Sequence, residues 1–193
     1  MQDVFFFGYG SLVNRDTHSY GRAHPARLPG WRRAWRHTPM RPVAFLTAEP
    51  DSSSTIEGLI AAVPGADWAA LDLREAAYMR QPVCEHVEHI LSPRPAVSVY
   101  TIPAGRYGAP SQQHPVLLSY LDVVVRGYLR EYGAEGVARF FATTDGWDAP
   151  LLDDRASPLY PRHQRLAPAE RALVDDAIAR LGVTITRTPP PGL

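Results

Sequence analysis

Short runs of apolar, β-favouring residues dominate the first half of the chain, and longer helical periodicities dominate the second half. Residues 4–7 form a continuous apolar run that stops at a glycine, which predicts a strand buried on both faces. Residues 27–37 predict a second strand, because Trp31 and Trp35 fall on one face and arginines on the other. Further strands are predicted over residues 43–47, 56–63, 83–90 and 96–102.

Turn and breaker residues separate these strands. The polar run at residues 51–54 predicts a loop between two strands. Gly58, inside the strand predicted over 56–63, indicates a bulge or a close approach of another segment.

Helical periodicity first appears after Pro64-Gly65, where Asp67 is suited to cap a helix reaching about residue 80. From Pro115 the chain again follows a helical period. Residues on one face of that helix are Leu117, Leu121, Val124 and Tyr128. A short helix is predicted over residues 134–142, and another over 168–180 that ends at Gly182.

The order of these elements predicts an α+β, mixed fold rather than regular βαβ alternation. A length of 193 residues suits one compact domain, which we place over residues 1–187. The proline-rich residues 188–193 are expected to form a flexible tail.

Charge and cysteine content narrow the classes of partner. The formal net charge is zero, so neither nucleic acid nor a membrane is an expected partner. All basic residues are arginines, which excludes lysine Schiff-base chemistry and the phosphate-binding P-loop. Cys84 is the single cysteine, and we find neither a signal peptide nor a long apolar run. We therefore expect a cytoplasmic protein.

The first candidate for chemistry is the glycine loop, residues 8–12 (Gly8, Tyr9, Gly10, Ser11 and Leu12). Glycines after a buried strand let backbone N–H groups face outward, which suits a carboxylate or an oxyanion. The loop fits neither a dinucleotide fingerprint, because Val13 replaces its third glycine, nor a nucleophile elbow, because Ser11 follows both glycines. A tight turn without function is the alternative.

The second candidate is Glu75. If a helix spans 67–80, Glu75 lies on the same stripe as Trp68, Leu71, Tyr78 and Met79. A carboxylate among apolar side chains loses hydration, which raises its pKa and suits it to proton transfer near neutral pH. A structural ion pair, with Arg74 or another arginine, is the alternative.

Together these features resemble the gamma-glutamylcyclotransferase family, particularly its ChaC-like branch. The resemblance covers about the first 130 residues. The segments that carry it are residues 7–12, residues 28–33, the strand with Gly58, residues 71–75 with Tyr78, Val99-Tyr100, and residues 119–122.

This resemblance implies a barrel-like mixed β-sheet flanked by helices, with a cavity between the loop and Glu75. It implies that Glu75 is the general acid/base and that the loop binds substrate. Leu12 stands where many members have Asn, and Ala76-Ala77 replaces glycines that commonly follow the glutamate. From about residue 133 onward, no family role is assigned, and this stretch is a candidate for setting specificity.

The implied reaction closes a γ-glutamyl amide to 5-oxoproline and releases an amine. A γ-glutamyl peptide, a γ-glutamyl amino acid and glutathione are all candidate substrates. Tyr78, Tyr100 and Tyr120 are candidate phenol donors to the substrate. No cofactor or metal is required, and the protein is expected to be a monomer or homodimer.

Other functions remain open at this point. They are cleavage of a γ-glutamylamine or related amide on the same fold, and a non-catalytic small-molecule binding module. We disfavour three further readings. These are a metal site on Cys84, His86 and Glu88, a nucleic-acid surface over residues 31–41, and a hydrolase triad built on Ser11.

Overall fold

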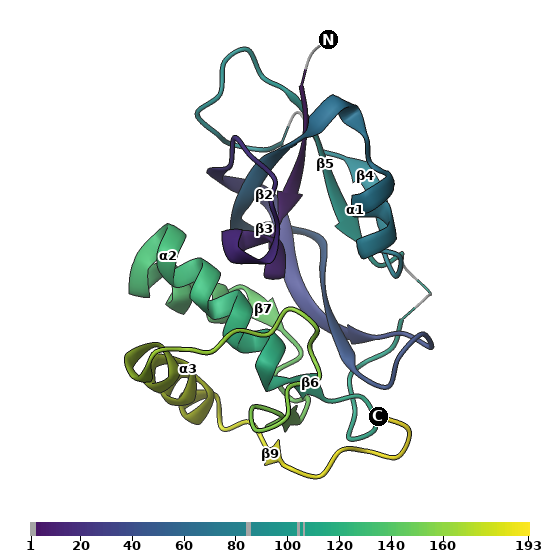
Figure 1. Ribbon diagram of the computed structural model, residues 1–193, viewed down its shortest axis with the longest axis vertical. Coiled ribbons are helices and arrows are strands. Elements are labelled where there is room, and N and C mark those ends of the chain that lie inside the picture. Colours follow the sequence, from purple (N-terminus) through teal and green to yellow (C-terminus); the bar gives the residue numbers. More distant parts are fainter. Residues whose placement is uncertain (1–2, 84–85, 104, 106) are drawn as a thin grey trace.

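A computed structural model describes residues 3–83, 86–103, 105 and 107–193. Its principal feature is a six-stranded mixed sheet in the order β4-β5-β1-β3-β2-β7 (Figure 1). The strands of this sheet are β1 (Val4–Gly8), β2 (His24–His37), β3 (Ala44–Val63), β4 (Met79–Pro82), β5 (Ala96–Thr101) and β7 (Thr144–Asp145). Three short parallel strands, β6 (Val116–Leu117), β8 (Leu151–Leu152) and β9 (Ile185–Thr186), form a second sheet.

Strand β1 lies inside the sheet, with antiparallel β3 on one side and parallel β5 on the other. Its three phenylalanines are at most 1% exposed, which confirms the strand buried on both faces. Both edges of β1 are paired up to Phe7, and Gly8 at its end still pairs with Leu59 of β3. The glycine loop therefore begins from a rigid point.

Strands β2 and β3 form a long antiparallel pair, and β3 corrects one sequence prediction. The strands predicted over 43–47 and 56–63 are two parts of the same strand, and residues 51–54 do not separate them as a loop. The register instead shifts, because Pro29 pairs with Thr55 and Trp31 pairs with Pro50. The polar run is thus accommodated as an irregularity in a continuous pairing, where Asp51 accepts hydrogen bonds from Ser53 and Ser54.

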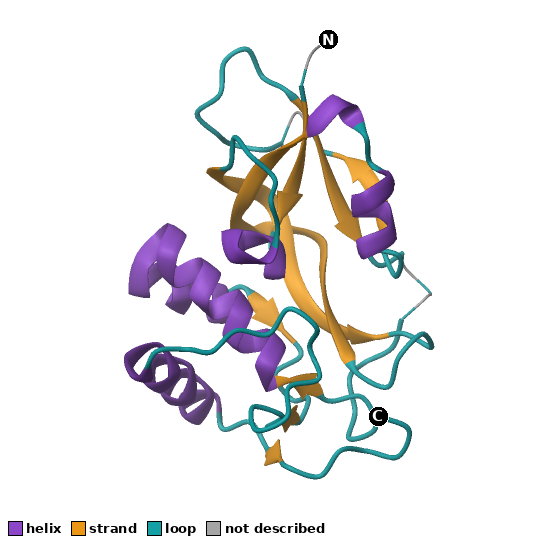
Figure 2. Ribbon diagram, viewed as in Figure 1, coloured by secondary structure: helices purple, strands orange, loops and turns teal. Residues whose placement is uncertain are grey.

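Two helices from the second half lie side by side at one end of the large sheet (Figure 2). Helix α2 (Leu118–Ala142) contains a kink at Gly133, whose φ is 68°, so the two helical segments predicted there are confirmed as parts of one element. Helix α3 (Pro168–Leu181) packs against α2 and ends at Gly182 in the left-handed conformation, as predicted. Tyr128 and Phe140 of α2 are fully buried in the main core.

Helix α1 (Ala69–Arg74) is shorter than the predicted helix over 67–80. The chain turns at Glu75, where the Tyr78 N–H donates to the Glu75 carbonyl, and then enters β4. The pairing of β4 with β5 outweighs the helix-favouring alanines at 76 and 77, a tertiary override of local propensity. Met79 consequently leaves the proposed stripe and is 52% exposed.

The strand predicted over 83–90 is also wrong. Of the described residues in that stretch, only Glu88 makes a β-bridge, with Arg27. His86 and Glu88 do not lie in a strand, and Cys84, the third member of the predicted single-face set, lies outside the described residues. Within the described part of the chain, no helix has the length and apolar character needed to cross a membrane. The α+β fold with a mixed sheet flanked by helices is confirmed.

Candidate active site

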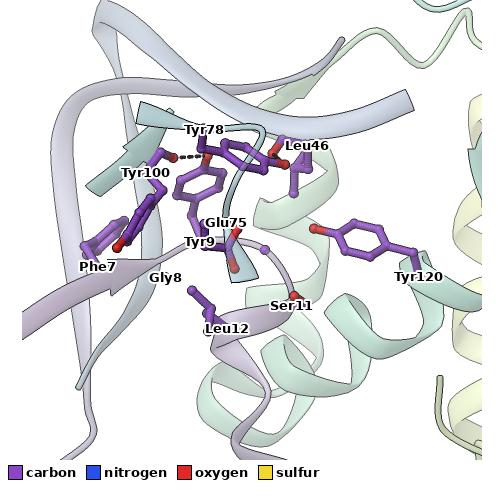
Figure 3. Close-up of a pocket in the computed structure, with 11 residues that line it drawn as sticks. Phe7, Gly8, Tyr9, Ser11, Leu12, Leu46, Glu75, Tyr78, Tyr100 and Tyr120 are labelled. Carbon is purple, nitrogen blue, oxygen red and sulfur yellow. Dashed lines mark hydrogen bonds between the residues drawn. The ribbon is translucent and has the colours of Figure 1, made fainter. Parts of the chain in front are cut away.

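A small cavity, here called the inner recess, lies between the glycine loop and the end of α1 (Figure 3). Its volume is about 30 Å³. The residues that line it are Phe7, Gly8, Tyr9, Gly10, Ser11, Leu12, Leu46, Glu75, Tyr78, Tyr100 and Tyr120. All nine candidate residues from the sequence are therefore brought together. Phe7 and Leu46 were missed because their apolar character is indistinguishable from that of core residues.

The glycines of the loop are needed for space. A Cβ on Gly8 would lie 2.5 Å from the Cβ of Leu12, and one on Gly10 would lie 2.6 Å from the Tyr120 hydroxyl. Neither glycine has a positive φ, so close packing rather than left-handed backbone explains them. Gly58 of β3 acts in the same way, since its Cβ would lie 2.4 Å from the Gly8 carbonyl oxygen. The close approach predicted at Gly58 is thus confirmed.

Helix α2 holds the far end of the loop. The Tyr128 hydroxyl lies 2.9 Å from the Tyr9 carbonyl oxygen, and Asn14 donates to the Val123 carbonyl at 2.9 Å. Gly127 allows this contact, because a Cβ there would lie 2.7 Å from the Asn14 backbone nitrogen. The loop is therefore fixed by β1 at its start and by α2 at its end.

Two backbone N–H groups of the loop have no acceptor among the described residues. Within the described structure, the N–H groups of Tyr9 and Gly10 donate no hydrogen bond to the protein. The residues that follow are tied into a short 3-10 turn, in which Val13 donates to Gly10 and Asn14 donates to Ser11. Free N–H groups beside a cavity are the usual donors to a carboxylate or to a developing oxyanion.

Glu75 caps the end of α1 and lines the recess, with 16% of its side chain exposed. Burial raises the pKa of Glu75 above its usual value, while the positive charges of Arg74 and Arg162 oppose that rise. The Arg74 guanidinium lies 3.1 Å from the Glu75 carboxylate and also donates to Ser11 Oγ and the Thr17 carbonyl. Both sequence readings of Glu75 therefore describe the same residue: it lines the pocket and it forms an ion pair.

The tyrosines of the recess differ in how their hydroxyls are used. Tyr78 donates to the Leu46 carbonyl at 2.9 Å, and Tyr9 donates to the Tyr100 carbonyl. The Tyr100 hydroxyl is bonded to Asp72 and points away from Tyr120 (Figure 3). The Tyr120 hydroxyl points into the space between Leu46 and Ser11 (Figure 3). Burial raises the pKa of Tyr120 well above its usual value, so it is a neutral donor.

A second cavity of about 250 Å³, here called the outer pocket, shares Ser11, Leu46, Glu75, Tyr78 and Tyr120 with the inner recess. Its remaining walls come from the start of β3, from Leu73–Ala77 at the end of α1, and from the connection between β8 and α3. The lining residues outside the shared set are Met40, Arg41, Val43, Ala44, Phe45, Leu73, Arg74, Ala76, Ala77, Leu117, Leu159, Tyr160, Pro161 and Arg162. Residues 159–162 belong to the stretch to which no family role was assigned, and no local pattern predicts that they lie near Glu75.

A scan against protein-family models and a search of curated proteins find no match. Solved structures do match. A gamma-glutamyl cyclotransferase aligns over 91% of this chain and 99% of its own, with a TM-score of 0.55 and 14% identity. An uncharacterized protein from Homo sapiens aligns over the same shares, with a TM-score of 0.57 and 12% identity. YkqA from Bacillus subtilis matches 72% of this chain and 53% of its own, with a TM-score of 0.57 and 17% identity.

These comparisons establish the fold class. The chain has the mixed α+β fold that is found in a gamma-glutamyl cyclotransferase, and the likeness extends over most of both chains. At identities of 12–17%, the likeness extends to the fold and not to the chemistry of the site. The chemistry of the site therefore depends on the residues around the inner recess.

Proposed function

We propose that the protein is an enzyme of the gamma-glutamylcyclotransferase type, which cyclises a γ-glutamyl amide to 5-oxoproline and releases an amine. The observation that carries the proposal is Glu75, a carboxylate with a raised pKa that faces a loop with free N–H donors across one recess. Perturbed carboxylates in clefts are typical of acid/base catalysis.

The chemistry requires one proton to move twice. The α-amine of the γ-glutamyl group attacks its own side-chain carbonyl carbon, forming a C–N bond and then breaking the bond to the leaving nitrogen. An α-amine has a pKa of about 7.7–8.0, so part of it is already neutral near neutral pH, and this neutral form is the nucleophile. As the new C–N bond forms, Glu75 takes one of the two amine protons and delivers it to the departing nitrogen, so that 5-oxoproline keeps one N–H and the amine leaves neutral.

The remaining residues have positioning and electrostatic roles in this proposal. Because the nucleophile is already part of the substrate, the enzyme mainly has to hold the curled conformer. The free N–H groups of Tyr9 and Gly10 stabilise the oxyanion formed on the carbonyl, and the Tyr120 hydroxyl donates a further hydrogen bond. Gly10 permits the Tyr120 hydroxyl to approach the loop this closely.

The dimensions of the two cavities suit this arrangement. A recess of about 30 Å³ holds little more than one water-sized group, so it accommodates the reacting carbonyl and not the whole substrate. The remainder of the substrate extends into the outer pocket, past Glu75 and Tyr78, which line both cavities.

The test is to incubate the purified protein with glutathione, γ-glutamyl amino acids and γ-glutamylamines, and to quantify 5-oxoproline. We expect turnover of at least one class and a loss of about 100-fold or more in kcat for Glu75→Gln. Glu135→Gln is the matched control, because the Glu135 side chain is 92% exposed and lies outside both cavities.

Two results would contradict the proposal. One is the absence of 5-oxoproline with every γ-glutamyl compound. The other is a Glu75→Gln variant that turns over as fast as the wild type, in which case the ion pair with Arg74 is the only role of Glu75.

A further inference from the structure

The outer pocket carries an excess of positive charge. Arg41, Arg74 and Arg162 line it, and Glu75 is the one acidic residue among its described lining residues. Arg74 is already bonded to Glu75, Ser11 and Thr17. Arg41 and Arg162 are exposed, and among the residues that the structure describes neither forms an ion pair or a side-chain hydrogen bond. Two guanidinium groups are thus available to an anionic ligand.

The same pocket has an apolar rim. Met40 is 60% exposed, Leu73 is 79% exposed and Leu159 is 42% exposed, and all three line the outer pocket. They come from three separate segments, before β3, within α1 and between β8 and α3. Isolated exposed apolar residues need no explanation, but a set that converges on one cavity indicates a binding surface.

The rim that carries Leu159 and Arg162 is held in place by the fold. The Leu159 N–H donates to Asp154 at 2.9 Å, and the Tyr160 N–H lies 3.3 Å from Ser119 Oγ. The Tyr160 ring packs edge-on against Tyr120, with ring centroids 5.0 Å apart. Because Tyr120 also lines the inner recess, this rim has a fixed position relative to the reacting groups.

The volume of the outer pocket limits the size of the ligand that it can hold. A volume of about 250 Å³ lies just below the ~300–1,000 Å³ typical of pockets for drug-sized ligands. A group the size of an amino acid fits this description. A ligand matched to the walls carries a carboxylate for Arg41 and Arg162, and an apolar side chain for the rim.

We propose that the outer pocket receives the departing amine and selects leaving groups that carry both a carboxylate and an apolar side chain. The preferred substrates are then γ-glutamyl derivatives of hydrophobic amino acids, rather than γ-glutamylamines. This inference rests on the proposed function, because it assigns the leaving-group side of the same reaction. Arg162 is the residue that recognises the carboxylate, and Arg41 lies in the wall of the same pocket.

The experiment compares two substrates that differ by one carboxylate, γ-glutamyl-leucine and γ-glutamyl-3-methylbutylamine. We expect the wild type to favour γ-glutamyl-leucine by about tenfold or more in kcat/KM, the effect of a charge-assisted contact. Arg162→Ala should remove most of this preference by slowing γ-glutamyl-leucine more than γ-glutamyl-3-methylbutylamine. Arg165→Ala is the control, because Arg165 is exposed on the same connection but does not line the pocket.

The ratio of the two substrates isolates the carboxylate contact. Removing Arg162 also removes a positive charge that acts on Glu75, and this affects both substrates equally. If Arg162→Ala slows both substrates to the same extent, Arg162 holds the glutamyl part and the inference is wrong. If the wild type shows no preference, the inference is wrong while the proposed function stands.

A binding measurement separates the two proposals. With the full-length Glu75→Gln protein, calorimetry should give a lower Kd for γ-glutamyl-leucine than for γ-glutamyl-3-methylbutylamine, and Arg162→Ala should abolish the difference. Equal affinities would overturn the inference even if 5-oxoproline is formed. If the affinity difference is observed but no substrate yields 5-oxoproline, the proposed reaction is wrong and the proposed carboxylate-binding site still stands.

The apolar rim has its own comparison. Leu159→Ala should reduce kcat/KM for γ-glutamyl-leucine about threefold or more and leave γ-glutamyl-glycine unchanged, because glycine has no side chain to contact the rim. Ile90→Ala is the control, since Ile90 is 78% exposed and lies outside the pocket. An equal effect of Leu159→Ala on both substrates would exclude the rim from leaving-group selection.

Discussion

Substitution of Gly58 by alanine tests how the sheet positions the glycine loop. The added Cβ would lie 2.4 Å from the Gly8 carbonyl oxygen and 2.6 Å from Phe7 Cζ. The Gly8 carbonyl is backbone in a strand paired on both sides, and Phe7 is 1% exposed, so neither can move aside cheaply. Relief of the clash requires β1 and β3 to separate at the point where the loop begins.

This clash lowers the free energy of unfolding. Overpacking of a buried site costs about 1–3 kcal/mol, and a backbone neighbour favours the upper end. For a protein of 193 residues, each kcal/mol corresponds to about 2–4 °C in Tm, so about 3 kcal/mol lowers Tm by about 6–12 °C. Replacing a glycine also reduces the conformational entropy of the unfolded chain, which stabilises the folded state by about 0.4–1 kcal/mol and offsets part of this cost.

Gly21→Ala is the matched control, because a Cβ at Gly21 meets no atom within 4 Å and its φ is not positive. Both variants restrict the unfolded chain to the same extent, so the difference between their Tm values reports the destabilisation caused by the clash at Gly58. Thermal unfolding should be combined with 5-oxoproline formation measured well below both Tm values, where Gly58→Ala should lose kcat through displacement of the loop. Equal Tm values for the two variants, or full activity in Gly58→Ala, would refute the reasoning.

Two further predictions follow from the site and its supports. Since burial raises the pKa of Glu75 in the folded protein, the folded state binds more protons than the unfolded state between the usual and the raised pKa, and stability falls as pH rises through that window. The Tm of Glu75→Gln relative to wild type should therefore be higher at pH 7.5 than at pH 4; a difference independent of pH would contradict this. Asp154→Ala removes the acceptor of the Ser119 and Leu159 N–H groups, so it should cost about 1–3 kcal/mol and raise KM for γ-glutamyl-leucine more than it lowers kcat. Asp148→Ala, at an exposed position outside both cavities, should change neither, and an unaltered KM in Asp154→Ala would exclude Asp154 as a positioning residue.

The amino-acid sequence determined the elements whose signals are local. An apolar run before a glycine defined β1, and Gly182 defined the end of α3. The spacing of Leu121, Val124 and Tyr128 predicted α2, whereas Leu117, placed on the same face, lies in β6. The sequence also supplied the nine candidate residues that line the inner recess, through a combination of the glycine loop, Glu75 and a family resemblance. These predictions are correct because each rests on a hydrophobic period or a glycine that is visible within a short stretch of sequence.

Only the tertiary structure decided where α1 ends and what completes the site. The segment after Arg74 favours a helix locally, but its pairing with β5 and the bond from Tyr78 to Leu46 draw it into a turn and a strand. Arg41 and Arg162 are far apart in the chain, and both line the outer pocket together with Glu75. No short-range sequence pattern predicts that these two arginines line one pocket. Their placement depends on how the connection after β8 packs against α2.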